Sequence, residues 1–218
     1  LIEAQLEAIF TDIRVDAVKI GMLSGPEIIE VVSSFFSSLH KGNIYAGRYT
    51  DLPVILDPVM VAKSGDRLLQ LEAIEMMKTE LFPLVRVLTP NIPETEALLD
   101  MRVAGIEDMK KACGELLKMG PDWVVVKGGH LQEEPVDVAG NAEGIHLIGG
   151  KRVATNNNHG TGCTLSSAIA AFIGQGDDEL IAIQKARAYI QSCLKHGFKL
   201  GKGVGILDHF TGKLNLNS

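Results

Sequence analysis

The chain opens with apolar residues at helical spacing, which predict an amphipathic helix. They are Ile2, Leu6, Ile9 and Ile13. Pro26 suits the first turn of a second helix, and Pro93 suits that of a short third one. Further helices are predicted at about 107–119, 161–174 and 178–198. The polar stretch 40–51 is predicted to be a surface loop.

Between these helices lie short runs that are almost entirely apolar. Four of them read DAVKIGML, PVILDPVM, LVRVLTPN and DWVVVKGG, and two weaker β segments cover about 136–139 and 145–154. Continuous apolar strands that alternate with helices are typical of a parallel sheet covered on both faces. We therefore predict an α/β fold with a mainly parallel central sheet. Ligands of such folds bind beyond the carboxyl ends of the strands.

Composition and charge limit the partners and the cellular location that we expect for the protein. The 218 residues carry a net charge of −6, and no apolar run reaches the roughly 18 residues of a membrane span. Neither nucleic acid nor a membrane is therefore an expected partner. The three cysteines show no CxxC spacing, which argues against disulfides and structural zinc and favours a cytoplasmic location. Because the chain starts at Leu1 inside a predicted helix, organellar targeting stays open.

The motif HGTGC, 159–163, stands at the start of a predicted helix. Gly160 and Gly162 allow a tight turn there. The free N–H groups and the helix dipole then form an anion site, to which Thr161 adds a hydroxyl. The helix start also favours the thiolate of Cys163, as a general base or, with a nearby histidine, as a nucleophile. An ordinary helix entry with a packed Cys163 fits these five residues equally well.

Polar or charged residues also follow three of the predicted strands. Asn91 and Glu94 can hold a hydrated Mg²⁺ through water, although Glu94 also suits the positive end of a helix. Asp57 ends a buried strand as a further acid. Lys63 follows it in a loop that either faces phosphate or is a solvated turn. Lys127 ends the strand in WVVVKGGH, where it either reaches a phosphate or turns to solvent.

Together these residues place an anion site, a candidate base, two acids for a metal and a phosphate-binding lysine at one edge of the sheet. This set of groups suits phosphoryl transfer. The sequence contains no GxxxxGK[ST] motif of a P-loop and no GxGxxG after its early strands. A P-loop site and a Rossmann dinucleotide site are therefore not predicted.

Five motifs follow one another along the chain: KIGML, VILDPVMVAKSGD, LTPNIPETEALL, VVVKGGHL and NHGTGCTLSSAIAA. With the ending GKGVGILDHF, they closely resemble the hydroxymethylpyrimidine/phosphomethylpyrimidine kinases of thiamine biosynthesis, in the ribokinase-like superfamily. The resemblance extends from about Leu1 to Phe210. It implies a three-layer sandwich and a single kinase domain over residues 1–218. The implied activity is ATP- and Mg²⁺-dependent phosphorylation of 4-amino-5-hydroxymethyl-2-methylpyrimidine and then of its monophosphate to the diphosphate.

The resemblance also implies roles for particular residues. Gly160, Thr161 and Gly162 resemble the anion hole for the transferring phosphoryl group. Cys163 resembles the family's catalytic position, which is aspartate in most sugar kinases of the superfamily.

Four further positions match the family at the strand ends. Asn91 and Glu94 match an Asn-x-x-Glu element that acts on Mg²⁺ and phosphate. Asp57 resembles a further metal-linked acid, and Lys127 resembles the lysine that binds ATP phosphate.

Met22 and Val59 resemble wall residues of the family's pyrimidine pocket. The family's SGGAGIQAD-like opening and AQN-like segment, which supply further pocket contacts, do not occur in this sequence. We therefore expect the domain to lack its first strand or strands. The resemblance further implies a small-molecule pyrimidine substrate and a homodimer.

Two alternatives stay open. A pyridoxal or pyridoxine kinase of the same branch uses a similar ring bearing a hydroxymethyl group and can share the GTGC element. A non-catalytic nucleotide- or pyrimidine-binding module is the alternative from another class, favoured by the missing N-terminal segment. A sugar kinase fits less well, because Cys163 occupies the position where aspartate is expected.

Overall fold

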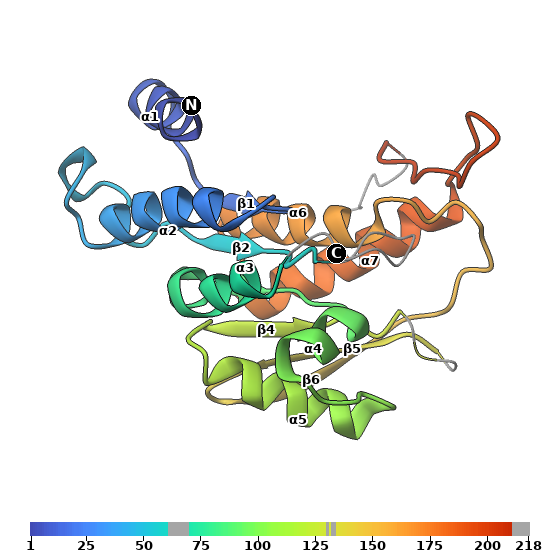
Figure 1. Cartoon of the computed structure of the whole chain (residues 1–218). Coiled ribbons are helices and arrows are strands. Elements are labelled where there is room, and N and C mark those ends of the chain that lie inside the picture. The colour runs from blue at the N-terminus through green and yellow to red at the C-terminus, as the bar shows by residue number, and fades with distance from the viewer. Residues whose placement is uncertain (61–69, 130, 132–133, 211–218) are drawn as a thin grey trace.

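A six-stranded sheet forms the centre of the computed structural model, which describes residues 1–60, 70–129, 131 and 134–210 (Figure 1). The strands lie side by side in sequence order: β1 (Val18–Ile20), β2 (Val54–Leu56), β3 (Val87–Leu88), β4 (Trp123–Val126), β5 (Val136–Asn141) and β6 (Gly144–Gly149). The pairs from β1 to β4 are parallel. β5 and β6 form an antiparallel hairpin on β4. The predicted mainly parallel sheet is confirmed, and the weaker β segments are its antiparallel part.

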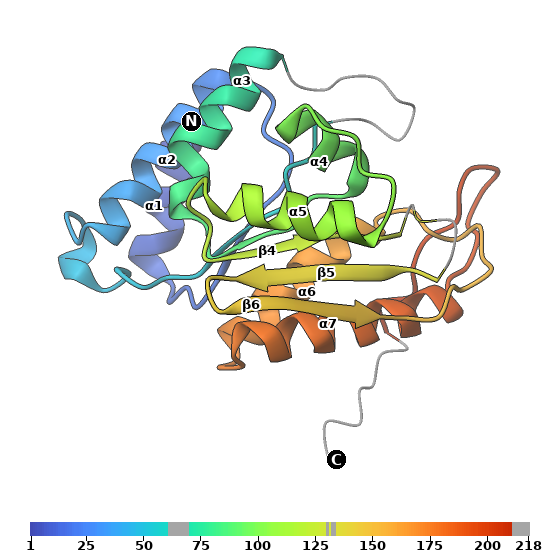
Figure 2. The same cartoon turned by 90° about the horizontal axis from the view of Figure 1, so that it is seen from below.

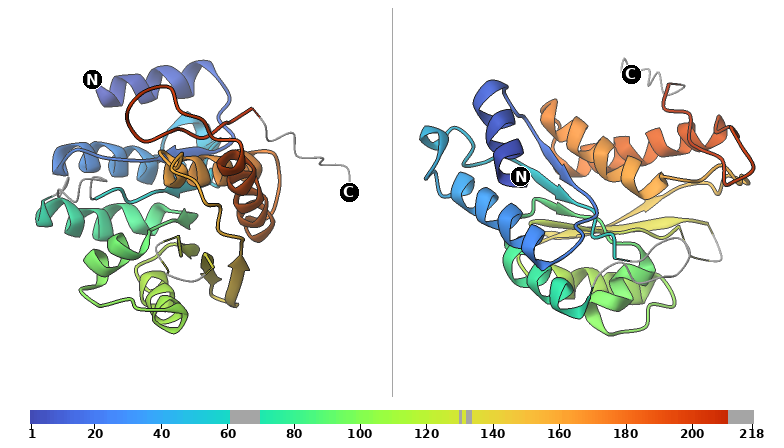
Figure 3. Two further views of the ribbon diagram at one scale, coloured as in Figure 1. Left: turned by 90° about the vertical axis from the view of Figure 1, so that its right-hand side faces the viewer. Right: turned by 45° about the horizontal axis from the view of Figure 1, so that its top comes forward.

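Helices cover both faces of this sheet, as predicted (Figures 2 and 3). The first side carries α2 (Pro26–His40), α3 (Leu71–Met76), α4 (Ile92–Leu99) and α5 (Ile106–Leu117), with α1 (Ile2–Asp12) packed against α2. The second side carries α6 (Thr161–Gly174) and α7 (Glu179–Lys195). The three-layer sandwich is therefore present. None of the helices in the described part of the chain is both long and apolar enough to cross a membrane.

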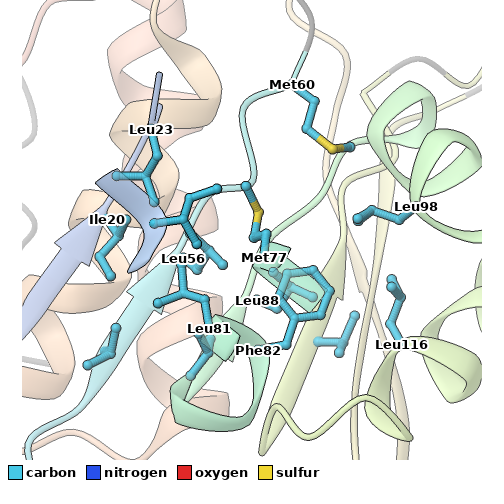
Figure 4. Packing of buried hydrophobic residues seen from close by; sticks show 14 of the residues in the cluster. Ile20, Leu23, Leu56, Met60, Met77, Leu81, Phe82, Leu88, Leu98 and Leu116 are labelled. Atoms are coloured by element: carbon cyan, nitrogen blue, oxygen red, sulfur yellow. The ribbon is translucent and has the colours of Figure 1, made fainter. Parts of the chain in front are cut away.

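Alternating strand residues divide the core between the two faces, because successive side chains of a strand point in opposite directions. Leu56 and Leu88 pack with the helices of the first side (Figure 4), whereas Ile55 and Val87 pack with α6 and α7. All four side chains are fully buried. The strands are apolar throughout because both of their faces are covered, and their polar residues begin where the strands end.

One helical region and one strand boundary differ from the prediction. Residues 71–81 form α3 followed by a π-helical turn, η2 (Met77–Leu81), and no helix was predicted there. Ile74, Met77 and Leu81 are buried at helical spacing, so the periodic signal was present in the sequence. β6 ends at Gly149, five residues before the predicted end of that segment.

The polar stretch 40–51 takes part in the core. It contains a 3₁₀ turn, η1 (Tyr45–Gly47), and its Tyr45 and Tyr49 rings pack against Phe10 at centroid distances of 6.0 and 5.0 Å. Phe10 also packs edge-on against Phe35 of α2 at 5.2 Å. Tyr45 has a φ of 53°, a left-handed conformation that non-glycine residues rarely adopt. The stretch is therefore a packed connection and not a bare surface loop.

Candidate active site

A buried ion pair joins the ends of two strands. Asp57 directly follows β2 and Lys127 directly follows β4, and the two side chains are almost completely buried. The Nζ atom of Lys127 lies 2.7 Å from Oδ1 of Asp57. Thr89, at the end of β3 between them, donates from its hydroxyl to the same Oδ1 at 3.5 Å. The carboxyl edge of the parallel strands thus brings together two of the predicted residues and adds Thr89.

Asn91 and Glu94 form a reciprocal cap at the start of α4. The backbone N–H of Glu94 donates to Oδ1 of Asn91, and the backbone N–H of Asn91 donates to Oε2 of Glu94, both at 2.8 Å. Such a capping box satisfies two N–H groups that the helix leaves unpaired. The same Oε2 lies 3.9 Å from Nζ of Lys127. The cap therefore fixes the second carboxyl group beside the lysine.

Burial changes the protonation of Glu94. It raises the pKa of this carboxyl group from 4.5 to about 7. The positive charge of Lys127 and the N–H of Asn91 act against this rise, and the negative charge of Asp57 adds to it. At neutral pH the site therefore contains the Lys127–Asp57 ion pair and a second carboxyl group that is only partly ionised.

The start of α6 has the features of an anion-binding site. Its N-cap residue, Gly160, has a φ of 82°, a conformation that favours glycine. The hydroxyl of Thr161 donates to the backbone oxygen of Asn158 at 2.8 Å, which closes the turn before the helix. The first N–H groups of a helix have no acceptor within it, and the helix dipole adds positive potential at the same place. These features suit an anion, and the anion site predicted from HGTGC stays a prediction.

Gly162 brings this helix start onto the ion pair. A Cβ atom placed on Gly162 would lie 3.2 Å from Nζ of Lys127 and 3.8 Å from Oδ2 of Asp57. α6 also packs against β1 and β2, which holds its first turn over the strand ends. The first turn of α6, Lys127, Asp57 and Glu94 therefore form one cluster, and the absence of a side chain at Gly162 permits the close approach.

Cys163 follows Gly162 in the first turn of α6, and its side chain is exposed. The other two cysteines, Cys113 and Cys193, are buried, and burial raises the pKa of the Cys113 thiol to about 12. Cys163 is thus the accessible thiol beside the anion site. Among the described residues, no hydrogen bond links its thiol to His159, and the backbone N–H of His159 donates to the backbone oxygen of Gly205.

Three predicted site residues lie outside this cluster or beyond the described chain. Met22 lies two residues after β1 and is 57% exposed. Val59 is half-buried close to the ion pair, and its N–H donates to the backbone oxygen of Asp57 at 2.8 Å. Lys63 lies outside the described residues. Met22 and Val59 remain predictions for a pocket wall.

The sequence reasoning missed a buried ion pair, one member of which contacts the backbone just beyond Lys127. Asp137 of β5 is 4% exposed and lies with Oδ2 3.1 Å from Nε of Arg187 on α7. A carboxylate within the apolar run PVDVAG was a signal for a buried partner, since lone charges are seldom buried. The signal for Arg187 was its position on the apolar face of α7, next to Ala186 and on the same side as Ile183 and Ile190.

A helix start suited to an anion, over a lysine and two carboxyl groups at the carboxyl edge of a parallel sheet, is typical of a phosphotransferase of the α/β class. The sequence model of the family described as phosphomethylpyrimidine kinase matches residues 1–208. The chain belongs to this family and is a kinase with the ribokinase-like fold.

Relatives and solved structures agree with this assignment. The hydroxymethylpyrimidine/phosphomethylpyrimidine kinase of Streptomyces coelicolor is 37% identical over 208 residues, which cover 95% of this chain and 73% of the relative. The crystal structure of phosphomethylpyrimidine kinase from Clostridium difficile 630 is 37% identical with a TM-score of 0.72 and covers 87% of this chain and 74% of that one. Pyridoxal kinase from Staphylococcus aureus in complex with AMP-PCP is 30% identical with a TM-score of 0.85, covering 98% and 74%.

The site also fits a magnesium ion of the kind used in phosphoryl transfer. Within the described residues, no group of three or more His, Cys, Asp and Glu side chains is arranged to hold a metal by itself. Mg²⁺ is commonly bound through one or two carboxylates, with waters and substrate phosphates as its remaining ligands. Asp57 and Glu94, which both have a carboxyl oxygen near the Lys127 ammonium group, at 2.7 and 3.9 Å, meet that requirement.

Proposed function

We propose that this kinase transfers the γ-phosphoryl group of ATP to the hydroxymethyl oxygen of 4-amino-5-hydroxymethyl-2-methylpyrimidine. It then phosphorylates the resulting monophosphate to the diphosphate. The observation that carries the proposal is the helix start of α6 placed over Lys127 and Asp57 in a chain of the phosphomethylpyrimidine kinase family. The names of its relatives support the substrate, since they carry the kinase name for both steps.

In this proposal, the first turn of α6 binds the phosphoryl group as it moves. The backbone N–H groups from Gly160 to Cys163 stabilise the charge on its oxygens, and Lys127 neutralises charge on the neighbouring ATP phosphates. Backbone donors of this kind are already oriented before the reaction and need no reorganisation during it. Asp57 keeps the Lys127 ammonium group close to the helix start.

Asp57 and Glu94 would hold Mg²⁺, in part through water. The bound ion would supply positive charge to the phosphate oxygens. Both carboxyl groups have to be ionised for this role. The capping bond from the N–H of Asn91 favours the ionised form of Glu94 and keeps its carboxyl group in place.

Cys163 takes up the proton in the first step. The hydroxymethyl oxygen forms its new bond to the γ-phosphorus, the bond from that phosphorus to the bridging oxygen breaks, and ADP leaves. The hydroxyl proton passes to the Cys163 thiolate, which later returns it to water. In the second step the attacking oxygen belongs to a phosphate that is largely deprotonated at neutral pH. Cys163 is therefore needed less in the second step than in the first.

A Cys163→Ala variant tests this proposal. Turnover of the hydroxymethylpyrimidine is expected to fall about 10²- to 10⁴-fold, the usual contribution of general acid–base catalysis. Turnover of the monophosphate falls less, and binding of ATP is retained. ADP release, with each acceptor in turn, measures turnover, and calorimetry with AMP-PCP measures nucleotide binding.

Ser167→Ala is the matched control, because Ser167 is exposed on α6 one turn beyond Cys163. It is expected to change neither step. If the Cys163→Ala variant turned over the hydroxymethylpyrimidine normally, Cys163 would not be the base of the first step. If the variant lost both steps equally, the proposal that Cys163 is needed less in the second step would be wrong. If no acceptor caused ADP release by the unmodified protein, the proposed substrate would be wrong.

Pyridoxal is the second candidate substrate. Pyridoxal kinases from Bacillus subtilis and Staphylococcus aureus superpose over 98% of this chain with TM-scores of 0.84 and 0.85. The family match and the higher sequence identity to phosphomethylpyrimidine kinases favour the pyrimidine. Competition between pyridoxal and the hydroxymethylpyrimidine in the same assay decides between them, through the ratio of their kcat/KM values. The family assignment likewise favours a kinase over a non-catalytic binding module.

We also propose that the protein acts in the cytoplasm as a homodimer, with a small-molecule partner and neither nucleic acid nor a membrane surface. The net charge of −6 supports the absence of a polyanionic partner. Sedimentation measures the oligomeric state directly.

A further inference from the structure

A buried carboxylate on β5 touches the backbone immediately beyond Lys127. Oδ1 of Asp137 accepts a hydrogen bond from the backbone N–H of Gly128 at 2.8 Å. The N–H of Lys127 itself donates to the backbone oxygen of Pro90 at 2.8 Å. Two consecutive amides are therefore fixed, one to the end of β3 and one to the side chain of Asp137.

The packing around Gly128 leaves this backbone little freedom. A Cβ atom on Gly128 would collide with the backbone oxygen of Val136, so β4 and β5 lie as close together there as glycine permits. Burial raises the pKa of Asp137, and the charge of Arg187 and the N–H of Gly128 oppose that rise. A buried carboxylate with these partners acts as a fixed acceptor for the chain that leads into the site.

Arg187 connects this carboxylate to α7, which runs beneath β5 and β6 in Figure 2. Its Nε lies 3.1 Å from Oδ2 of Asp137 without the directional geometry of a hydrogen bond, so charge holds the pair together. Its Nη2 donates to the backbone oxygen of Pro135 at 3.0 Å. Arg187 thus binds both the side chain of Asp137 and the chain that enters β5.

We propose that Asp137 and Arg187 are positioning residues for Lys127, which set where its ammonium group meets the phosphates of the nucleotide. The inference rests on the part of the proposed function in which Lys127 binds phosphate. A buried ion pair adds little net stability by comparison with a well-packed apolar pair, so stability alone is a weak reason for one beside the site. Partners that orient metal ligands typically change metal affinity or activity 10- to 100-fold when they are removed, and we take the same scale for partners that orient Lys127.

The test uses the Asp137→Asn variant of the full chain and calorimetry with AMP-PCP and Mg²⁺. We expect the Kd for the nucleotide to rise about tenfold or more, in line with other orienting partners. The KM for the pyrimidine is expected to stay the same, because the variant acts at the nucleotide phosphates. Asp177→Asn is the matched control: Asp177 follows the C-terminal end of α6, the end opposite to the anion site, and pairs with Lys185 of α7 at 2.7 Å. It is expected to leave the Kd unchanged.

A double-mutant cycle separates positioning from plain stabilisation. If Asp137 acts through Lys127, the Asp137→Asn change has no further effect on the Kd in a Lys127→Met background. An equal effect in both backgrounds would overturn the proposal, as would an unchanged Kd in a folded Asp137→Asn protein. Arg187→Gln is the second variant and is expected to raise the Kd in the same way. If neither variant folds, the pair is structural and the proposal is rejected.

The same measurements distinguish a failure of this inference from a failure of the proposed function. AMP-PCP binding needs no pyrimidine. A protein that binds AMP-PCP through Lys127 but phosphorylates no pyrimidine contradicts the proposed substrate and leaves the inference standing. A protein that does not bind AMP-PCP contradicts both.

Discussion

Lys127 has two carboxyl groups near its ammonium group, at different distances. Asp57 contacts its Nζ directly at 2.7 Å, whereas Oε2 of Glu94 lies 3.9 Å away and accepts an N–H from Asn91. Burial raises the pKa of Glu94 to about 7. A divalent cation bound there would favour the ionised carboxylate, so its binding is expected to release protons near neutral pH.

Glu94 is expected to make the stability of the folded protein depend on pH. Its pKa is higher in the folded protein than in the unfolded chain. The stability that this difference gives the folded protein is fully present below about pH 4.5 and is lost as the pH rises through 7. The free energy of unfolding relative to Glu94→Gln is expected to fall by roughly 2–3 kcal/mol between about pH 5 and pH 8. Urea unfolding without Mg²⁺ and nucleotide measures it. Parallel pH profiles for the two proteins would contradict the shift.

Among the site residues, the sequence predicted those that follow strands, because a polar side chain after an apolar run can be recognised from the sequence alone. Asp57, Asn91, Glu94 and Lys127 were found in this way. Asp137 was not, because its partner Arg187 is 50 residues away and the pair forms only in the folded protein. The contact between Glu94 and Lys127 was not predicted either, because it depends on how the neighbouring strands β3 and β4 pair.

At the scale of elements, the start of α6 shows how a missing side chain serves a site. Gly162 is a helical residue, so its glycine is not needed for an unusual backbone angle. The space that it leaves is filled by Nζ of Lys127. Helix stability therefore favours alanine at position 162, whereas the close approach of Lys127 favours glycine.

Gly162→Ala is expected to separate those two demands. Alanine is favoured over glycine within a helix by about 1 kcal/mol, so the melting temperature stays the same or rises. Its Cβ atom would lie 3.2 Å from Nζ of Lys127, which has to move, so we expect kcat/KM for ATP to fall at least tenfold. Gly114→Ala is the control, since Gly114 of α5 has open space around its Cβ position. A Gly162→Ala enzyme with unchanged kinetics would show that the contact is unimportant.

Helical periodicity or a first-turn proline predicted α1, α2 and α4 to α7, and the ranges predicted for α5, α6 and α7 end within three residues of the observed bounds. Of the apolar face predicted for α1, Ile9 and Ile13 are exposed. The pattern did not predict the π-helical turn after α3, which depends on local backbone hydrogen bonds. The sequence also did not predict that the β5–β6 hairpin pairs antiparallel with β4. Short apolar segments do not reveal the direction of pairing.

At the scale of the whole molecule, α1 is attached through few contacts. Phe10 is its one fully buried residue among those described, and the Phe10 ring joins α1 to α2 and to the stretch 40–51. Ile9 and Ile13 on the same helix are 46% and 56% exposed. The interactions that hold α1 are thus separate from those that form the site.

We therefore expect Phe10→Ala to weaken the attachment of α1 while leaving the chemistry intact. Truncation of a buried phenylalanine costs about 3–5 kcal/mol. Hydrogen exchange in α1 and the stretch 40–51 is expected to accelerate, whereas the Kd for AMP-PCP at low temperature stays the same. Ile9→Ala, at an exposed position of α1, is expected to change stability by less than about 0.5 kcal/mol. Loss of AMP-PCP binding in folded Phe10→Ala protein would show that α1 supports the site.

The strand order has a consequence for protein synthesis. Each strand of the sheet pairs with the strand made just before it, so the growing chain can extend the sheet in the order in which it leaves the ribosome. Asp57, Asn91 and Lys127, which follow β2, β3 and β4, are synthesised in the same order. The anion-binding turn is made after all six strands and then packs back onto β1 and β2. A nascent chain can therefore bring Asp57 and Lys127 together once its first four strands are made, but it gains the helix start proposed to bind phosphate only after all six strands.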